Sequence, residues 1–247
     1  MYNELLWVVM IAANFLIILA LYRWLGQIGI LLWIPIAVIL ANIQVIKAVE
    51  LFGFNATLGN ILYGTTFLVT DILSENHGKR SARLAVYIGF IALIAATVLM
   101  NLALLFVPAA EDFSQESLQT IFSLLPRITL ASLLAYSMSQ LHDVWAFHLW
   151  RKRFPAKRAL WIRNLASTGI SQALDSLVFT TVAFYGVFSI SVFWDIVLTT
   201  YFLKLIVAFL DTPMVYMAQR WHDNPELRRQ WQRRTSMLGV AEIEEEQ

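Results

Sequence analysis

Two similar segments, "SQLHD" and "SQALD", each place an amide and an acid in stretches that are otherwise apolar. In each segment the glutamine (Gln140 or Gln172) precedes the aspartate (Asp143 or Asp175) by three residues. On a helix, residues three apart share one face. A carboxylate can accept two N–H groups in a fork, and an amide both donates and accepts. Each face is therefore suited to holding the polar edge of a small molecule, carrying a proton or joining two helices.

The apolar stretches around these segments are long enough to cross a membrane. Of the 247 residues, 59% are hydrophobic and 14% are charged, whereas a soluble domain carries about 25% charged residues. Apolar runs of about twenty residues match the hydrocarbon core of a bilayer, which is about 30 Å thick. The sequence therefore predicts an all-α, polytopic membrane helix bundle that contacts the lipid bilayer.

Seven apolar runs are predicted to be membrane spans, which form a single transmembrane domain over 1–218 and leave a cytoplasmic tail over 219–247. The runs cover about 4–22, 27–47, 56–75, 83–107, 126–149, 163–187 and 192–218. The weakest break is "YGVFSIS", between the last two runs. In a six-span alternative, either the sixth run is re-entrant or the first run is peripheral.

Positive charge is concentrated in alternate connections. Lys and Arg follow the first, third, fifth and seventh runs, most densely in "RKRFPAKR" (151–158), whereas the connection after the fourth run is acidic. Short cytoplasmic loops collect Lys and Arg. This pattern predicts that the N-terminus lies outside and the C-terminus inside the cell.

Polar side chains within these runs are candidates for a binding site. An ionisable group near the bilayer centre costs about 2.5–3.5 kcal/mol on insertion scales, so such groups should face a cavity or one another. A rise of 1.5 Å per residue brings the two paired motifs toward a common depth on antiparallel helices. The predicted site residues are Asn42, Asn60, Asp71, Gln140, Asp143, Gln172, Asp175 and Lys204, and Glu75 and Asp71 are candidates for a gate or proton relay.

A purely structural role is the alternative for most of these side chains. The aspartates of the paired motifs could form an ion-pair network with Lys204, and the two asparagines could join neighbouring helices. Glu75 and Asp211 lie near the ends of runs and could extend to the membrane interface. His142 points away from Asp143, since successive helical residues are 100° apart. We therefore expect no metal or catalytic role for this histidine.

Several functional classes lack support in the sequence. It contains no phosphate-binding loop, no HExxH and no GxSxG motif. The absence of cysteine excludes disulfides and thiolate metal sites. The Ser, His and Asp of "SQLHD" diverge on one helical turn and cannot form a catalytic triad. A net charge of +1 gives no basis for nucleic-acid binding. We expect no enzyme, metal or cofactor here.

Four polar segments, taken together and in their order along the chain, form a pattern specific enough to compare with a known protein family. They are "TLGNILYGTTFLVTDILSENHGKRSAR", "SLLAYSMSQLHDVWAFHLWRKR", "NLASTGISQALDSLVFTTVAF" and "YFLKLIVAFLDTPMVY". In this order they resemble the signature blocks of the queuosine-precursor transporters, which belong to the vitamin uptake transporter family. The resemblance covers roughly residues 40 to 218. It makes the first run an N-terminal addition to a six-helix core.

The resemblance implies import of 7-cyano-7-deazaguanine or 7-aminomethyl-7-deazaguanine through the bacterial inner membrane. It also implies a core similar to the substrate-binding subunits of energy-coupling factor transporters, but with no ATPase partner. The alternative is a binding subunit for another vitamin-like small molecule that does need an ATPase. Either protein could form a homo-oligomer, and the sequence does not distinguish proton coupling from facilitated diffusion.

The chemistry of a deazaguanine ring agrees with the candidate side chains. Its N–H groups suit a carboxylate that accepts two hydrogen bonds in a fork, such as that of Asp175 or Asp143. Its carbonyl oxygen requires a donor, such as Lys204 or a nearby amide. The flat ring favours aromatic neighbours. The resemblance and the residue types therefore predict one polar site between helices.

Overall fold

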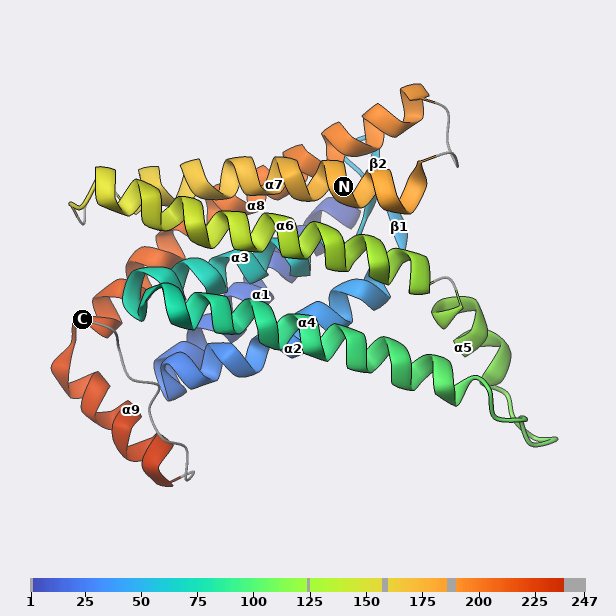
Figure 1. Cartoon of the computed structure of the whole chain (residues 1–247), viewed down its shortest axis with the longest axis horizontal. Coiled ribbons are helices and arrows are strands. Elements are labelled where there is room, and N and C mark those ends of the chain that lie inside the picture. The colour runs from blue at the N-terminus through green and yellow to red at the C-terminus, as the bar shows by residue number, and fades with distance from the viewer. Residues whose placement is uncertain (1, 124, 157–159, 186–189, 238–247) are drawn as a thin grey trace.

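The computed structural model is a bundle of long helices, which Figure 1 shows lying along the longest axis of the molecule. It describes residues 2–123, 125–156, 160–185 and 190–237. The long helices are α1 (Tyr2–Leu25), α2 (Gln27–Gln44), α3 (Gly59–Asn76), α4 (Gly78–Ala103), α6 (Leu125–Arg153), α7 (Leu160–Phe184) and α8 (Ile190–His222). The shorter elements are the strands β1 (Ala48–Leu51) and β2 (Phe54–Thr57) and the helices α5 (Gln115–Phe122) and α9 (Pro225–Met237).

This architecture confirms the predicted polytopic helix bundle and corrects some of its details. Each predicted apolar run corresponds to one long helix, but the helix bounds differ by several residues. The hairpin of β1 and β2, the loop helix α5 and the tail helix α9 were not predicted. Strands of four residues are too short for a clear alternating pattern. The predicted break near 186–189 and the acidic end of the tail lie outside the described residues.

Two tight turns depend on positive backbone φ angles. Gly26 (φ 60°) separates α1 from α2 without a loop, and the ring of Trp231 packs against it. A Cβ atom at Gly26 would lie 2.9 Å from Cδ2 of Trp231, so a side chain there would clash. Phe52 (φ 52°) and Gly53 (φ 81°) form the two-residue loop of the hairpin. Such loops favour type I′ turns, in which both residues have positive φ.

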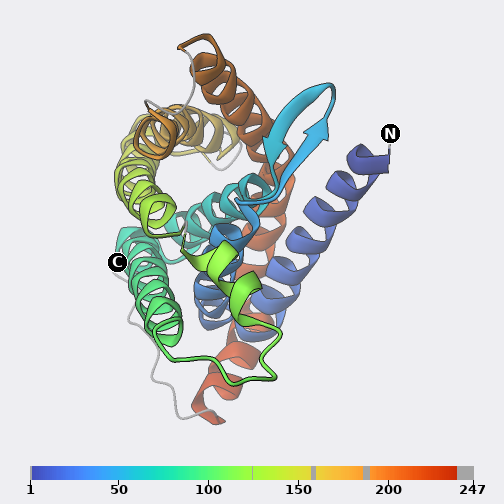
Figure 2. The same cartoon turned by 90° about the vertical axis from the view of Figure 1, so that its right-hand side faces the viewer.

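Helix α3 lies in the centre of the bundle. All of its residues, from Gly59 to Asn76, are buried. It packs against α2, α4, α6 and α8, and Figure 2, viewed along the bundle, shows these helices around it. Because protein surrounds α3 on all sides, its side chains need not be apolar to avoid lipid. This explains why a helix with Asp71 and Glu75 can run through the middle of the molecule.

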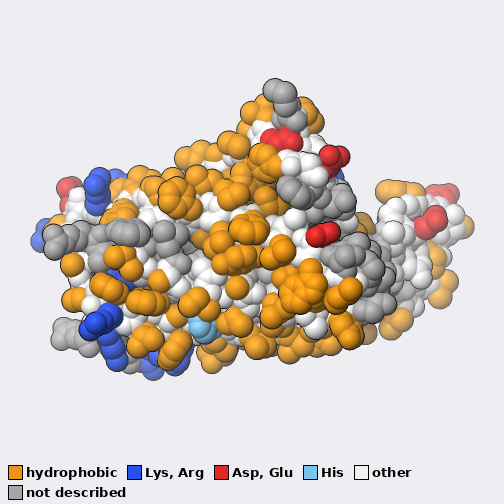
Figure 3. Space-filling view, turned by 90° about the horizontal axis from the view of Figure 1, so that it is seen from above, with side chains coloured by type: hydrophobic (Ala, Val, Ile, Leu, Met, Phe, Trp, Pro, Cys, Tyr) orange, Lys and Arg blue, Asp and Glu red, His pale blue; other side chains and the backbone are white. Residues whose placement is uncertain are grey.

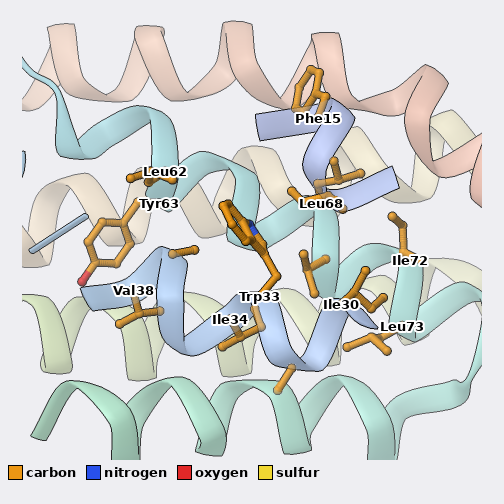
Figure 4. Close-up of a cluster of buried hydrophobic side chains, with 14 of the residues drawn as sticks. Phe15, Ile30, Trp33, Ile34, Val38, Leu62, Tyr63, Leu68, Ile72 and Leu73 are labelled. Atoms are coloured by element: carbon orange, nitrogen blue, oxygen red, sulfur yellow. The ribbon is translucent and has the colours of Figure 1, made fainter. Parts of the chain in front are cut away.

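One side of α3 is apolar. Figure 4 shows Leu68, Ile72 and Leu73 of α3 near Ile30 and Trp33 of α2 in a cluster of buried side chains. Small residues on α2, such as those at positions 37 and 41, are fully buried and permit close packing. The polar side chains of α3 are therefore left to face α6, α7 and α8.

Five stretches of the described chain are long and apolar enough to cross a membrane. They are α1, α2, α4, the stretch Gln115–Arg153 that contains α6, and Phe193–His222 in α8. The other two long helices, α3 and α7, are not among them. Figure 3 shows hydrophobic side chains over most of one face, with Lys and Arg gathered at one end. The protein is a multi-pass membrane protein, and the number of spans remains a prediction.

Candidate functional site

Polar side chains between α3, α6, α7 and α8 form three layers along the bundle. On α8, Lys204, Asp211 and Gln219 are all buried and are spaced by seven and eight residues, so they share one face. Their spacing separates them by about 10 and 12 Å along the helix axis. Each of these residues belongs to one layer. We call the layer of Lys204 the ion-pair layer, the layer of Asp211 the carboxyl layer and the layer of Gln219 the arginine layer.

The ion-pair layer joins α6, α7 and α8. Lys204 Nζ donates a hydrogen bond to Asp175 Oδ2, and the two form an ion pair. Ser139 Oγ donates to Asp175 Oδ1 at 3.1 Å. Both charged side chains are nearly inaccessible, with exposed fractions of 3% for Lys204 and 5% for Asp175. Each charge therefore depends on the other for compensation.

A small cavity lies beside this ion pair. Its volume is about 10 Å³, which is roughly room for one water molecule. Its lining consists of Val45, Asn60, Tyr63, Ser132, Ala135, Asp175, Phe179 and Lys204. Apolar and aromatic walls with a few polar groups that converge are typical of small-molecule sites. Asn60 Nδ2 has no hydrogen-bond partner among the described residues, so it is able to donate to a ligand.

Two amide side chains support the walls of this region rather than enter the cavity. Asn42 Nδ2 donates to the hydroxyl of Tyr63 at 3.2 Å and so helps to position that ring. Gln140 Nε2 donates to Thr66 Oγ1 at 2.9 Å, and Gln140 Oε1 accepts from Thr70 at 3.2 Å. These contacts attach α2 and α6 to α3. The asparagine on α2 and the glutamine on α6 thus act in part as links between helices.

Gln172 differs from these two amides. It is fully buried, and neither its oxygen nor its nitrogen has a partner among the described residues. An unsatisfied polar group in the interior costs about 1–3 kcal/mol. Gln172 is three residues before Asp175 and four after Thr168, so it lies on the same face of α7 between the ion-pair and carboxyl layers. It is therefore available to a ligand or to water.

The carboxyl layer brings together three acids from three helices. Asp71, Asp143 and Asp211 are all fully buried. The charged groups that act most strongly on Asp71 are Asp143 and Asp211, and Asp71 also accepts a hydrogen bond from Thr168 Oγ1 at 3.3 Å. Asp211, for which a place at the membrane interface was the alternative, is enclosed by protein in the bundle. The sequence did contain one indication that Asp211 is buried. Asp211 lies seven residues after Lys204, which places the two side chains on the same face of the helix.

The arginine layer closes one end of α3. Arg163 Nη2 and Gln219 Nε2 both donate to Glu75 Oε1, at 2.8 and 2.7 Å. Arg151 Nη1 donates to the backbone carbonyls of Ser74 (2.8 Å) and Glu75 (3.1 Å) in the last turn of α3. A cation there satisfies carbonyls that have no partner within the helix. Glu75 is thus held by an ion pair with Arg163, a residue that did not stand out in the sequence.

The two paired motifs do not meet at one level. Ser139, one helical turn before Asp143, is the α6 residue that contacts Asp175. Asp143 instead faces Asp71 in the carboxyl layer. His142 lies apart from Asp143 and forms a hydrogen bond with Ser171 Oγ at 2.9 Å. Counted from Arg151 and Arg163, Ser139 and Asp175 are both twelve residues deep, whereas Asp143 is only eight, so the expectation of a common level for the two aspartates ignored a difference of one helical turn.

Comparison with known proteins identifies the family. A family model described as "Putative vitamin uptake transporter" matches residues 57–218. This segment begins at the end of β2 and includes the ion-pair and carboxyl layers. The chain belongs to the vitamin uptake transporter family. It is therefore a transporter and not an enzyme.

Three members with assigned names are similar to this transporter. The "Probable queuosine precursor transporter" of Bacillus subtilis (strain 168) is 44% identical over 92% of this chain and 99% of its own. The "Queuosine precursor transporter" of Escherichia coli (strain K12) is 25% identical over 69% of this chain and 75% of its own. The Haemophilus influenzae (strain ATCC 51907 / DSM 11121 / KW20 / Rd) protein, also a "Probable queuosine precursor transporter", is 30% identical over 54% of both chains. No solved structure matches this transporter.

The first of these matches bears on α1. Because α1 makes up 24 of the 247 residues, a match to 92% of the chain must include part of it. Helix α1 also packs against α2, α3 and α8 within the bundle. Helix α1 is thus packed into the bundle, and its place as an addition to a six-helix core remains a prediction.

Proposed function

We propose that this protein imports the queuosine precursors 7-cyano-7-deazaguanine and 7-aminomethyl-7-deazaguanine across the bacterial inner membrane. The names of its relatives, and above all the relative that is 44% identical over nearly its whole length, support this substrate class. The observation that carries the proposal is the cavity beside Asp175 and Lys204, which combines an acid, a base and aromatic walls.

The ion-pair layer is chemically matched to a guanine-like edge. Asp175 accepts the two N–H groups of that edge, and Lys204 donates to the adjacent carbonyl oxygen. The substrate therefore replaces one ion pair with contacts to both charges, so that neither buried charge is left uncompensated. Tyr63 and Phe179 contribute ring faces, and Asn60 contributes a free N–H group. Gln172, with both amide atoms available, extends the site toward the carboxyl layer.

Binding requires the helices to move. A cavity of about 10 Å³ is far smaller than a purine-sized ring, so the described conformation is a closed one. The arginine layer is the gate on the side away from this cavity, since it ties α3 to α6, α7 and α8 through Glu75. Opening this gate breaks the contacts of Arg163 and Gln219 with Glu75.

The topology proposed with this function has seven spans, formed by α1–α4 and α6–α8. The gathering of Lys and Arg at one end supports a cytoplasmic location for that end, with the N-terminus outside. Helix α3 spans the membrane inside a sleeve of the other helices, whereas α7 spans it at the edge of the bundle, with Ile170 and Leu177 exposed. A six-helix core of α2–α4 and α6–α8, similar to energy-coupling factor binding subunits, is part of the same proposal.

The test uses bacterial cells that cannot synthesise the precursor and lack their own transporter. Expression of this protein should restore queuosine in tRNA when 7-cyano-7-deazaguanine is supplied. Asp175→Asn should abolish this rescue, whereas Asp195→Asn, an exposed acid on the same helix as Lys204, should not. Rescue by Asp175→Asn at the wild-type level would show that the site is misplaced.

A second test asks whether transport requires a partner ATPase. Purified protein in liposomes should take up labelled 7-cyano-7-deazaguanine without any other protein. Binding without uptake in these liposomes would favour a binding subunit that depends on an ATPase module. Failure of the purified, folded protein to bind the compound at all would refute the substrate class.

A further inference from the structure

The buried acids of the bundle differ in what compensates their charge. Glu75 pairs with Arg163, and Asp175 pairs with Lys204. By contrast, neither Asp71 nor Asp143 forms an ion pair with any Lys or Arg that the structure describes. Removing a carboxylate from water without such a partner is strongly unfavourable. Among the described residues, Asp71 and Asp143 therefore lack the positively charged partner that Glu75 and Asp175 have.

Asp143 is the clearest case. Its side chain is fully buried, and neither carboxyl oxygen has a hydrogen-bond partner within the described parts of the chain. Asp71 Oδ1 is also without a partner there. The carboxyl groups of Asp71 and Asp143 nevertheless lie close enough to interact, and the hydroxyls of Ser167, Thr168 and Ser171 lie near Asp143. The layer thus contains carboxyl oxygens that lie near one another and have no hydrogen-bond donor among the described residues.

The charged groups on the surrounding helices do not fill this role. On α7 and α8 the buried Arg and Lys side chains are those of Arg163 and Lys204, and both are engaged by other acids. Arg220 and His222 lie in the last turn of α8, nine and eleven residues beyond Asp211. On α6, His142 is hydrogen-bonded to the hydroxyl of Ser171 at 2.9 Å, and so approaches Asp143 only through that hydroxyl. Helix α2 contains no ionisable residue, and the basic residues of α4 are confined to its first turns. The remaining acids nearby are Asp211 in the layer and Glu75, which lies one turn from Asp71 and is paired with Arg163.

A proton fits this arrangement better than a metal ion. A proton shared by two carboxyl groups needs no further ligands, whereas Ca²⁺ or Mg²⁺ needs about six or more oxygen atoms at short range. No group of three or more acidic or histidine side chains in the described residues is close enough to hold a metal ion. We propose that Asp71 and Asp143, with Asp211 beside them, bind a proton that enters the cell together with each substrate molecule.

The position of this layer links the proton to the substrate. Thr168 contacts Asp71, Gln172 lies one turn further along α7, and Asp175 follows three residues later. This face of α7 connects the carboxyl layer to the ion-pair layer. In each cycle one proton binds from outside and leaves to the inside past the arginine layer, and the carboxyl layer is then ready for another. The inference rests on the proposed transport function.

The experiment uses the full-length protein in liposomes that contain a pH-sensitive dye. Labelled 7-cyano-7-deazaguanine is added outside, with and without a pH gradient that is acidic outside. If one proton accompanies each substrate, a gradient of one pH unit supports about tenfold accumulation. The wild type should show this accumulation, together with acidification inside that depends on the substrate.

Variants separate coupling from folding. Asp143→Asn and Asp71→Asn should lose both gradient-driven accumulation and acidification, yet still exchange labelled for unlabelled substrate at equal pH. A merely structural role would lower exchange as well. Asp195→Asn is the control, and it should retain all three activities. If Asp143→Asn does not fold, Asp71→Asn and Asp211→Asn carry the same test.

Three results would overturn the inference. The wild type could transport substrate without moving protons, or a sodium gradient could drive uptake in place of a pH gradient. Folded Asp71 and Asp143 variants could also retain accumulation driven by protons. In each of these cases the proposed function would stand. By contrast, wild-type protein that neither binds nor exchanges the compound would refute the proposed function itself.

Discussion

The ion pair of Asp175 and Lys204 offers the sharpest prediction, because removal of either partner leaves the other charge buried. Both side chains are 5% exposed or less. Loss of one partner of such a pair typically costs about 3–5 kcal/mol. This is a large share of a total stability of about 5–15 kcal/mol. Asp175→Asn and Lys204→Met should each lower the unfolding temperature markedly.

The double variant Asp175→Asn/Lys204→Met removes both charges at once. Replacing a buried pair by neutral residues of similar volume is often neutral or stabilising. We therefore expect the double variant to recover most of the stability that each single variant loses, which gives a large coupling energy. The assay is thermal unfolding of the three purified variants in one detergent, with uptake measured in parallel.

Uptake then separates a binding role from a structural one. If the pair only holds α7 to α8, the double variant should recover uptake along with stability. If the pair binds the substrate, the double variant should be stable but inactive. Single variants as stable as the wild type would refute the argument from burial, and a double variant whose losses are merely additive would refute the coupling.

Two further predictions concern the ends of the bundle. Gly26→Ala should lower the unfolding temperature more than Gly53→Ala, because both glycines have positive φ but only Gly26 lies against Trp231; equal shifts in thermal unfolding would contradict this. Asp112 accepts hydrogen bonds from the backbone N–H and hydroxyl of Ser114 before α5, and these bonds lower the pKa of its carboxyl group. Because the folded pKa lies below that of the unfolded chain, this stabilisation is present above the ordinary value of about 3.9 and is lost as the pH falls through the lowered pKa. The protection of the α5 amides, corrected for the intrinsic exchange rate at each pH, should therefore fall in acid, and Asp112→Asn should remove that dependence on pH.

Much of the bundle is predictable from the sequence because the bilayer imposes a length and a polarity on each helix. The apolar runs locate the long helices, and the spacing of three residues places Gln140 and Asp143 on one face. Hydropathy does not distinguish a helix that lies in protein from one that faces lipid. For this reason the central position of α3 was not predictable, although it explains how that helix accommodates Asp71 and Glu75.

The contacts between helices were harder to predict than the helices themselves. Spacing along one helix gives the direction of a side chain but not its partner on another helix. Arg163 stands next to a basic connection, and nothing in its surroundings points to Glu75, which is 88 residues earlier. The depths of Asp143 and Asp175 likewise depend on how far α6 and α7 are shifted against each other. These quantities are set by packing of the whole bundle.

Helix α7 provides a mechanical connection between the three layers. Arg163 holds Glu75, Thr168 holds Asp71, and Asp175 holds Lys204. Helices in a packed bundle move largely as rigid bodies. A shift of α7 that opens the cavity beside Asp175 must therefore strain the contacts of Thr168 and Arg163 as well. Substrate binding, protonation of the carboxyl layer and opening of the gate would then be linked through one helix, without a separate pathway for each.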